Sequence, residues 1–325
     1  VSRLPILILL LHLIFLPFTS SSSLEPLSYD VYLRIPDEVS PFLPFSASIS
    51  IHLRLLQPST VLILHSVELS SFRNVSLVGF DQDEHSLKGI RITGEHVEFM
   101  YNELSRGEYI LHIGKYVGKM GDGSAGVFVR GASLYTHLQP SFARRVFPCI
   151  DQPNVRAPFR VSIEHSQRTI AFSNTGSVDE RMMGDRRVTT FGSTPSLPPY
   201  LIAFSVLPHS VIQLTGQTTF GVTVRVIGVT HSTLVRVLRA SIQAFEYLSD
   251  VMRIPLPLNK MDILLVHSYE GGMENWGHIM ISSSLAENGD DSHLMHLVAH
   301  ELAHHWIGNL ASVSSWAYIC LQVSN

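Results

Sequence analysis

Two histidines and a glutamate lie close together near the end of the chain, in the stretch His300-Glu301-Leu302-Ala303-His304. On an α-helix, residues four apart lie on the same face, so the imidazoles of His300 and His304 can point at one ion while Glu301 stands beside them. Imidazole is a common zinc ligand, and a carboxylate beside a zinc-bound water can act as a base. The spacing therefore predicts a zinc site with His300 and His304 as ligands and Glu301 as the catalytic residue.

The chemistry predicted for this site is the hydrolysis of an amide bond. Two imidazoles and a third ligand leave one zinc position for a water molecule, whose pKa the metal brings close to 7. Glu301 can take the proton of that water and pass it to the leaving amine. The alternative is that the histidines lie on a helix without binding metal, because such a pattern arises by chance in roughly a few per cent of histidine-rich sequences.

The residues around the pattern favour a helix. The run over residues 292–306 contains neither glycine nor proline, and Asp291 or Ser292 is expected to cap its amino end. Apolar residues that recur at helical spacing, and are expected to face the core, are Leu294, Leu297, Val298, Leu302 and Trp306.

A second motif, Gly-Gly-Met-Glu-Asn-Trp-Gly over residues 271–277, precedes the first by about thirty residues. By itself it would be a turn leading into a strand with one exposed glutamate. Together, the two motifs resemble the membrane alanyl aminopeptidase (aminopeptidase N) family of gluzincin zinc metallopeptidases, whose signatures are G-x-M-E-N and H-E-x-x-H-x18-E. The resemblance implies that Glu274 binds the free α-amino group of a peptide. It also implies that the rest of the motif lies along that peptide, namely Gly271, Gly272, Met273 and Asn275.

A third segment, over residues 136–153, is similar to the family's T-Q-x-E-P-x-x-A-R-R-x-F-P-C-x-D-E-P pattern. In the family, the glutamine of this segment is a second contact for the substrate's amino group, and the position is occupied here by His137. A neutral imidazole can accept a hydrogen bond, whereas a protonated one repels an ammonium group, so amine recognition is expected to depend on pH. Cys149 is expected to be a buried free thiol.

The third zinc ligand of the family, a glutamate, would stand at position 323, where this chain has Val323. His296 cannot replace it, because His296 and His304 lie about 12 Å apart along a helix. We expect His293, His296 and His305 to face solvent or a neighbour outside the sequence. A hypothesis for the unusual tail is intron read-through, since Val-Ser-Asn can be encoded by GTA-AGT-AAY.

Two functions from different classes remain open. The first is a zinc-dependent aminopeptidase that acts on peptides with a free amino terminus, of which this sequence is expected to be an incomplete chain. The second is a catalytically inactive relative that binds peptides or partners, which Val323 and His137 favour. Endopeptidase activity is disfavoured by the Gly-Gly-Met-Glu-Asn motif. Nucleic acid is excluded as a partner, because the net charge is −4 and no basic cluster is present.

The amino-terminal residues 1–23 predict a signal peptide or a signal anchor. An apolar run over residues 4–18 is followed by small polar residues, and a full bilayer span needs about 20 apolar residues. The expected location is therefore extracellular, either secreted or anchored at the cell surface. Asn74 begins an Asn-Val-Ser glycosylation sequon. The two cysteines exclude a disulfide-scaffold protein.

The fold expected is an α+β protein of two domains. Residues 27–227 predict a β-sandwich: residues 48–55 alternate between polar and apolar, and strands are also expected over residues 200–206 and 220–227. Near residue 228 the apolar period changes, which predicts a helix over residues 232–252. The resemblance implies that residues 228–325 form the front half of a thermolysin-like catalytic domain.

Overall fold

The computed structural model describes residues 23–80 and 83–323. The leader predicted at residues 1–23 lies outside the described residues except for its last residue, and the anchoring predicted for it lies outside them as well. None of the helices in the described ranges is long and apolar enough to cross a membrane.

The amino-terminal part is built from strands whose side chains alternate between core and surface. In β2 (Pro44–Leu55), Ile49, Ile51 and Leu53 are at most 1% exposed, which confirms the alternation predicted for this strand. β2 lies within a large sheet of strand order β13-β14-β11-β1-β2-β8-β4-β5. Its other strands are β1 (Leu24–Arg34), β4 (Ser70–Gly79), β5 (Glu84–His85), β8 (Gly107–Lys119), β11 (Phe159–Ser166), β13 (Ser177–Met183) and β14 (Arg186–Phe191).

Two smaller sheets complete this part. One has the order β3-β7-β6, and the other has the order β12-β15-β10-β9. Their strands are β3 (Ser59–His65), β6 (Gly89–Ile92), β7 (His96–Leu104), β9 (Gly126–Arg130), β10 (Ser133–His137), β12 (Thr169–Ser173) and β15 (Phe204–Pro208). The strand predicted over residues 200–206 begins late, because Pro199–Leu201 form a 3-10 helix; proline has no N–H group to give to a sheet.

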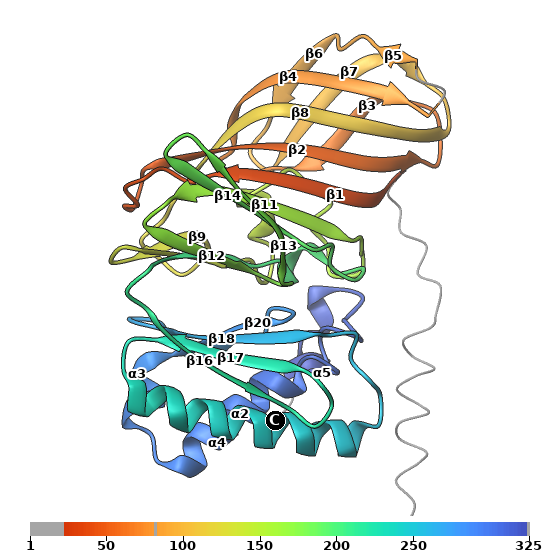
Figure 1. Ribbon diagram of the computed structural model, residues 1–325. Coiled ribbons are helices and arrows are strands. Elements are labelled where there is room, and N and C mark those ends of the chain that lie inside the picture. The colour runs from red at the N-terminus through yellow and green to blue at the C-terminus, as the bar shows by residue number, and fades with distance from the viewer. Residues whose placement is uncertain (1–22, 81–82, 324–325) are drawn as a thin grey trace, which may run out of the picture.

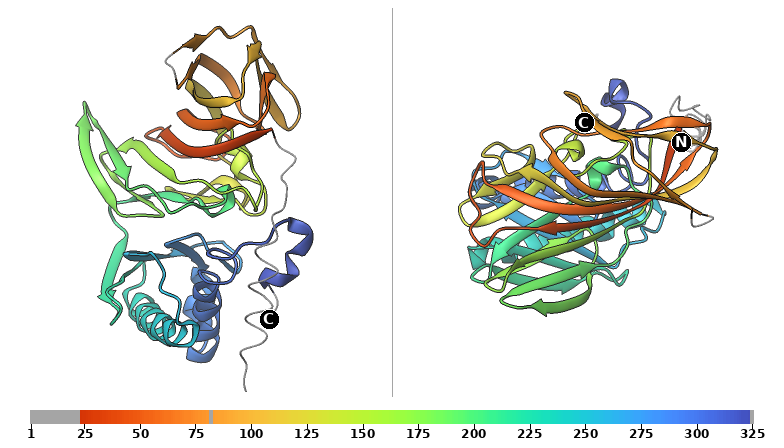
Figure 2. Two further views of the ribbon diagram at one scale, coloured as in Figure 1. Left: turned by 90° about the vertical axis from the view of Figure 1, so that its right-hand side faces the viewer. Right: turned by 90° about the horizontal axis from the view of Figure 1, so that it is seen from above.

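The second part is a mixed sheet with helices on one face. The strand order is β16-β17-β18-β20-β19. Its strands are β16 (Ile212–Gln217), β17 (Thr223–Gly228), β18 (Lys260–Val266), β19 (Gly272–Met273) and β20 (His278–Ser282), and its helices are α2 (His231–Met252), α3 (Ser283–Asn288), α4 (Asp291–Ala303) and α5 (Cys320–Val323). Helices α2 and α4 cover the face of the sheet that points away from the amino-terminal part (Figures 1 and 2).

Helix α2 confirms the helix predicted over residues 232–252. It ends at Met252, and its C-cap residue Arg253 takes a left-handed conformation with φ of 53° and lies two residues before Pro255. β16 and β17 join the second part, although the strand pattern placed them with the first. A strand's period shows which side chains share a face, but not which sheet the strand joins.

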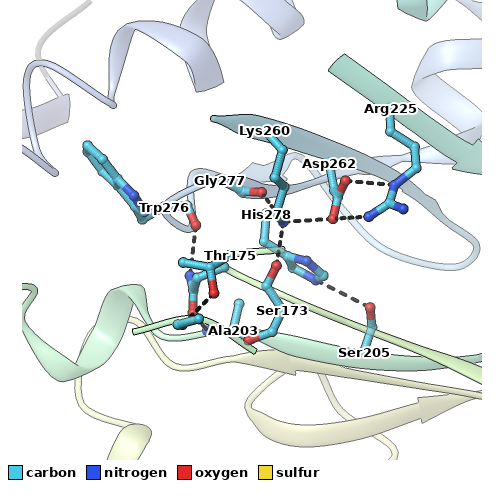
Figure 3. A network of polar contacts seen from close by, with 12 residues as sticks. Ser173, Thr175, Ala203, Ser205, Arg225, Lys260, Asp262, Trp276, Gly277 and His278 are labelled. Atoms are coloured by element: carbon cyan, nitrogen blue, oxygen red, sulfur yellow. Dashed lines mark hydrogen bonds and ion pairs between the residues drawn. The ribbon is translucent and has the colours of Figure 1, made fainter. Parts of the chain in front are cut away.

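The two parts meet through a buried polar network (Figure 3). The Lys260 ammonium donates to the Ser173 carbonyl of β12, to the Gly277 carbonyl and to the Asp262 carboxylate, which also pairs with Arg225. Asn174 donates from the β12 side to the Trp276 carbonyl. Because buried charges are tolerated only when paired and hydrogen bonded, this network ties the loop after Glu274 firmly to the amino-terminal part.

Candidate active site

The two histidines predicted as zinc ligands converge at the carboxyl end of α4. Their Nε2 atoms lie 3.2 Å apart. The Nδ1 atom of His304 is 3.0 Å from the carbonyl of Ile307, so in the neutral ring Nδ1 carries the proton and Nε2 presents its lone pair toward His300. Burial, and then the neighbouring His304, lower the pKa of His300, which favours the neutral ring that a metal requires.

This imidazole pair fits two ligands of one zinc ion. Two nitrogens at about 2.0–2.1 Å from a tetrahedral zinc would themselves lie about 3.3 Å apart. Within residues 23–80 and 83–323, no cluster of three or more His, Cys, Asp or Glu residues is placed to hold a metal. The pair therefore accounts for two of the ligands that a zinc site needs.

The capping residue of α4 differs by one position from the expectation. Asp290, rather than Asp291 or Ser292, is the N-cap, and its Oδ1 atom accepts from the backbone N–H of His293 at 2.8 Å. A side chain at the N-cap bonds two or three residues ahead, so the sequence allowed several neighbouring acids and serines.

Glu301 lies beside the pair and is almost completely buried, with 5% of its surface exposed. Burial, followed by the negative charge of Glu274, raises the pKa of the Glu301 carboxyl to about 9. The carboxyl fits against Gly272, where a Cβ atom would lie only 2.1 Å from its Oε1 atom. Glycine at position 272 is therefore what allows the Glu301 side chain to reach its place.

Glu274 follows directly after β19, the edge strand of the sheet in the second part of the protein, and is also 5% exposed. Its Oε1 atom accepts from Nε2 of Gln139 at 3.0 Å and from Nε2 of Gln322 at 3.2 Å. Its backbone carbonyl accepts from Nδ2 of Asn309 at 2.6 Å. The carboxylate is thus held by segments that lie far apart in the sequence.

One cavity of about 930 Å³ joins these groups. His300, Glu301 and His304 line it together with Glu274, Gln139, Gly271 and Gly272, and its other walls come from α3 and the first half of α4. Met273 and Asn275 are fully buried and are not among the residues that line the cavity. The predicted metal pair, base and amine-binding carboxylate therefore share one space.

His137 occupies a separate position beside this cavity. Its Nδ1 atom lies 3.0 Å from the hydroxyl of Tyr269, and the residue that contacts Glu274 from the amino-terminal part is Gln139. Burial lowers the pKa of the His137 imidazole, while the charge of Glu274 acts in the opposite direction. The ring is therefore neutral at neutral pH and can share a hydrogen bond with Tyr269.

Comparison with models of protein families identifies the family of this chain. The Peptidase M1 N-terminal domain matches residues 25–201, and the Peptidase family M1 domain matches residues 237–324. The first match alone covers more than half of the 325 residues. The chain belongs to the peptidase M1 family. The aminopeptidase resemblance predicted from the motifs is thereby confirmed, and so is the α+β fold class.

Relatives of this M1 chain are named as aminopeptidases. Mouse (Mus musculus) aminopeptidase Q is 31% identical over 92% of this chain and 60% of the relative. Aminopeptidase N of Haemonchus contortus is 28% identical over 93% of this chain and 34% of the relative. Aminopeptidase M1-B of rice (Oryza sativa subsp. japonica) is 28% identical over 92% of this chain and 35% of the relative. The chain thus spans between about a third and three fifths of these relatives.

The expectation that His305 faces solvent or an absent neighbour is wrong. His305 is completely buried, and its Nε2 atom accepts from the backbone N–H of Gly277 at 3.0 Å. Its ring also packs on Trp276, and burial lowers its pKa to about 3. His293 and His296 are exposed, as expected.

Sequence reasoning missed several residues of this M1 site. Gln139 and Gln322 hold Glu274, Asn309 holds its backbone, and Tyr269 pairs with His137. Two signals were available. Gln139 stands where the family pattern of the 136–153 segment has a glutamate, and Asn309 belongs to the Trp-Ile-Gly-Asn-Leu run after the metal pair.

Proposed function

We propose that this chain carries the peptide-binding and water-activating groups of a zinc-dependent aminopeptidase, which removes amino-terminal residues from peptides. The observation that carries the proposal is the shared cavity, in which the paired Nε2 atoms of His300 and His304 lie near the carboxyls of Glu301 and Glu274. The names of the M1 relatives support the same activity.

Glu274 would bind the free amino terminus of the peptide. An ammonium group that enters a closed cavity needs an acidic partner, and Glu274 supplies a carboxylate there. β19 lies at the edge of its sheet, and an edge strand is where an extended peptide backbone can pair with a sheet. An enzyme that requires the amine acts on the ends of peptides rather than within them.

His300 and His304 would hold the zinc ion, since their spacing fits two of its ligands. Bound zinc would supply a Lewis acid that polarises the scissile carbonyl and acidifies a water molecule. Glu301 would accept the proton of the attacking water and return it to the leaving amine. Because its pKa is raised by burial, a nearby cation is needed to favour the charged form of this carboxyl at neutral pH.

A second candidate function is a peptide-binding protein without catalysis. The valine at position 323, where the family signature has its third ligand, favours this alternative. With two protein ligands, zinc would be held weakly. Both functions use Glu274 to bind the amino group of a peptide, and only the peptidase needs the zinc ion.

Zinc analysis combined with a hydrolysis assay tests the proposal. The full-length protein should retain about one zinc ion after dialysis and release p-nitroaniline from leucine p-nitroanilide. His300→Ala and His304→Ala should lose both properties, whereas the exposed-site control His231→Ala should keep them. A wild-type chain with neither zinc nor hydrolysis would leave peptide binding as the function.

We further propose that the protein is glycosylated at Asn74 and is secreted or held at the cell surface. Asn74 is exposed on β4, and its backbone has a left-handed conformation with φ of 53°. Expression in a secreting eukaryotic cell should give a glycosidase-sensitive protein whose mass shift disappears in Asn74→Gln. An unchanged shift in that variant would exclude this site.

A further inference from the structure

The side-chain amides of Gln139 and Gln322 both donate a hydrogen bond to the Oε1 atom of Glu274. Gln139 reaches it from the segment after β10, in the amino-terminal part, and Gln322 reaches it from α5. A carboxylate only accepts hydrogen bonds, so each glutamine must turn its NH₂ group toward it. Neutral donors hold the oxygen in place and leave the negative charge of the carboxylate intact.

The position of the Gln322 side chain is fixed by the residues packed around it. Gln322 is 5% exposed, and its side chain packs on Gly308, where a Cβ atom would lie 3.0–3.1 Å from three of its atoms. The carbonyl of the same Gly308 accepts from the Tyr200 hydroxyl at 2.8 Å, which fixes the loop to the amino-terminal part. The amide of Gln322 is thus aimed at Glu274 by its surroundings and not by its own flexibility.

The other oxygen of the carboxylate, Oε2, has no donor among the residues that the structure describes. Both Glu274 and Gln139 line the cavity that contains the metal pair. With Oε1 fixed from two sides, the orientation of the carboxylate is set before any ligand arrives. A preorganised acceptor spares the ligand the cost of ordering it.

We propose that Gln139 and Gln322 are positioning residues that fix Glu274 through Oε1, so that Oε2 is presented to the α-ammonium group of a peptide. This inference rests on the proposed role of Glu274 in amine recognition. It adds that amine recognition depends on the segment after β10, which carries Gln139, and on α5, which carries Gln322. Amine binding requires both the amino-terminal part and α5 to be docked on the loop after β19.

The direct test is amine binding without catalysis. Calorimetry on the metal-free full chain compares leucinamide with N-acetyl-leucinamide, which lacks the ammonium group. Wild type should prefer leucinamide, and Gln139→Leu and Gln322→Leu should each weaken leucinamide binding by about tenfold, as expected for a lost hydrogen bond to a charged group. Binding of the acetylated compound should not change. Gln213→Leu, which removes an exposed glutamine of β16, is the matched control and should bind like wild type.

Two outcomes would overturn the inference. In one, wild type does not distinguish the two compounds. In the other, both leucine variants keep the wild-type preference while their melting curves show a folded chain. The two glutamines lie in different segments, so a folding defect in one variant leaves the other as a test.

Kinetics separates this inference from the proposed function. In an active enzyme, both variants should raise KM for leucine p-nitroanilide more than they lower kcat, because they act on the ammonium and not on the attacked carbonyl. An inactive chain that still shows the glutamine-dependent preference for leucinamide would refute the peptidase proposal and retain this inference. If both variants lost kcat to the same extent and kept the wild-type KM, the positioning role of the two glutamines would be contradicted.

Discussion

The Oε1 atom of Glu301 lies 2.1 Å from the place that a Cβ atom on Gly272 would take. The strand that would bind the peptide and the helix that carries the proposed base are therefore in direct contact. No side chain other than hydrogen fits at position 272 while Glu301 stays where it is.

The first prediction is that Gly272→Ala impairs catalysis more than stability. The clash involves the end of a flexible side chain, so Glu301 should swing aside rather than unfold the protein. A displacement of about 1 Å at a catalytic group can cost on the order of 10²-fold in kcat. Steady-state hydrolysis and thermal melting measure the two effects. Gly176→Ala is the control, since no heavy atom lies within 4 Å of a Cβ there. Equal activity in the two variants would mean that Glu301 is not the base.

The second prediction concerns Glu301 itself. Glu301→Gln keeps the size of the side chain but removes its ability to accept a proton. We expect kcat to fall by about 10²–10⁴-fold, as for the loss of a general base, with zinc content unchanged. The control is Glu180→Gln on the exposed strand β13. A variant that lost its zinc as well would point to a role for Glu301 in binding metal.

The metal pair could be predicted from the sequence because its geometry is local. A spacing of four residues at the end of one helix sets how His300 and His304 lie relative to each other, whatever the rest of the chain does. The same holds for the apolar stripe of α4, of which Leu294, Val298 and Leu302 are buried. Local periodicity also located α2 and the alternation of β2.

The contacts of Glu274 could not be predicted in this way. Gln139 is 135 residues away from it and Gln322 is 48 residues away, so only the docking of separate segments brings them together. The burial of His305 was missed for a related reason. The loop around Gly277, far from it in sequence, covers a helix end that the apolar period alone leaves exposed.

The third prediction is that Val323→Glu strengthens zinc binding. The family signature places a carboxylate ligand at this position, and a third donor would complete the set that the two imidazoles begin. The variant should retain zinc at chelator concentrations at least about tenfold higher than wild type does. Val323→Gln has the same length without the charge and should behave like wild type. Equal zinc retention in all three chains would show that position 323 does not reach the metal pair.

The fourth prediction is acid instability that originates at the contact between the two parts. His278 is fully buried next to Ser205 (Figure 3), and burial, followed by the charge of Lys260, lowers its pKa to about 3. In the unfolded chain this imidazole would have an ordinary pKa of about 6.5. Between these two values the unfolded chain binds more protons, so stability is complete above pH 6.5 and falls as the pH drops toward 3.

This histidine alone should lower the free energy of unfolding by about 1.4 kcal/mol per pH unit in that window. Urea denaturation at several pH values measures the slope. His278→Gln should have a smaller slope by about that amount, even if its stability at pH 7 is lower, because the variant has no imidazole to protonate. The exposed His231→Gln should keep the wild-type slope. If His278→Gln kept it as well, proton uptake at this contact would not be what destabilises the protein in acid.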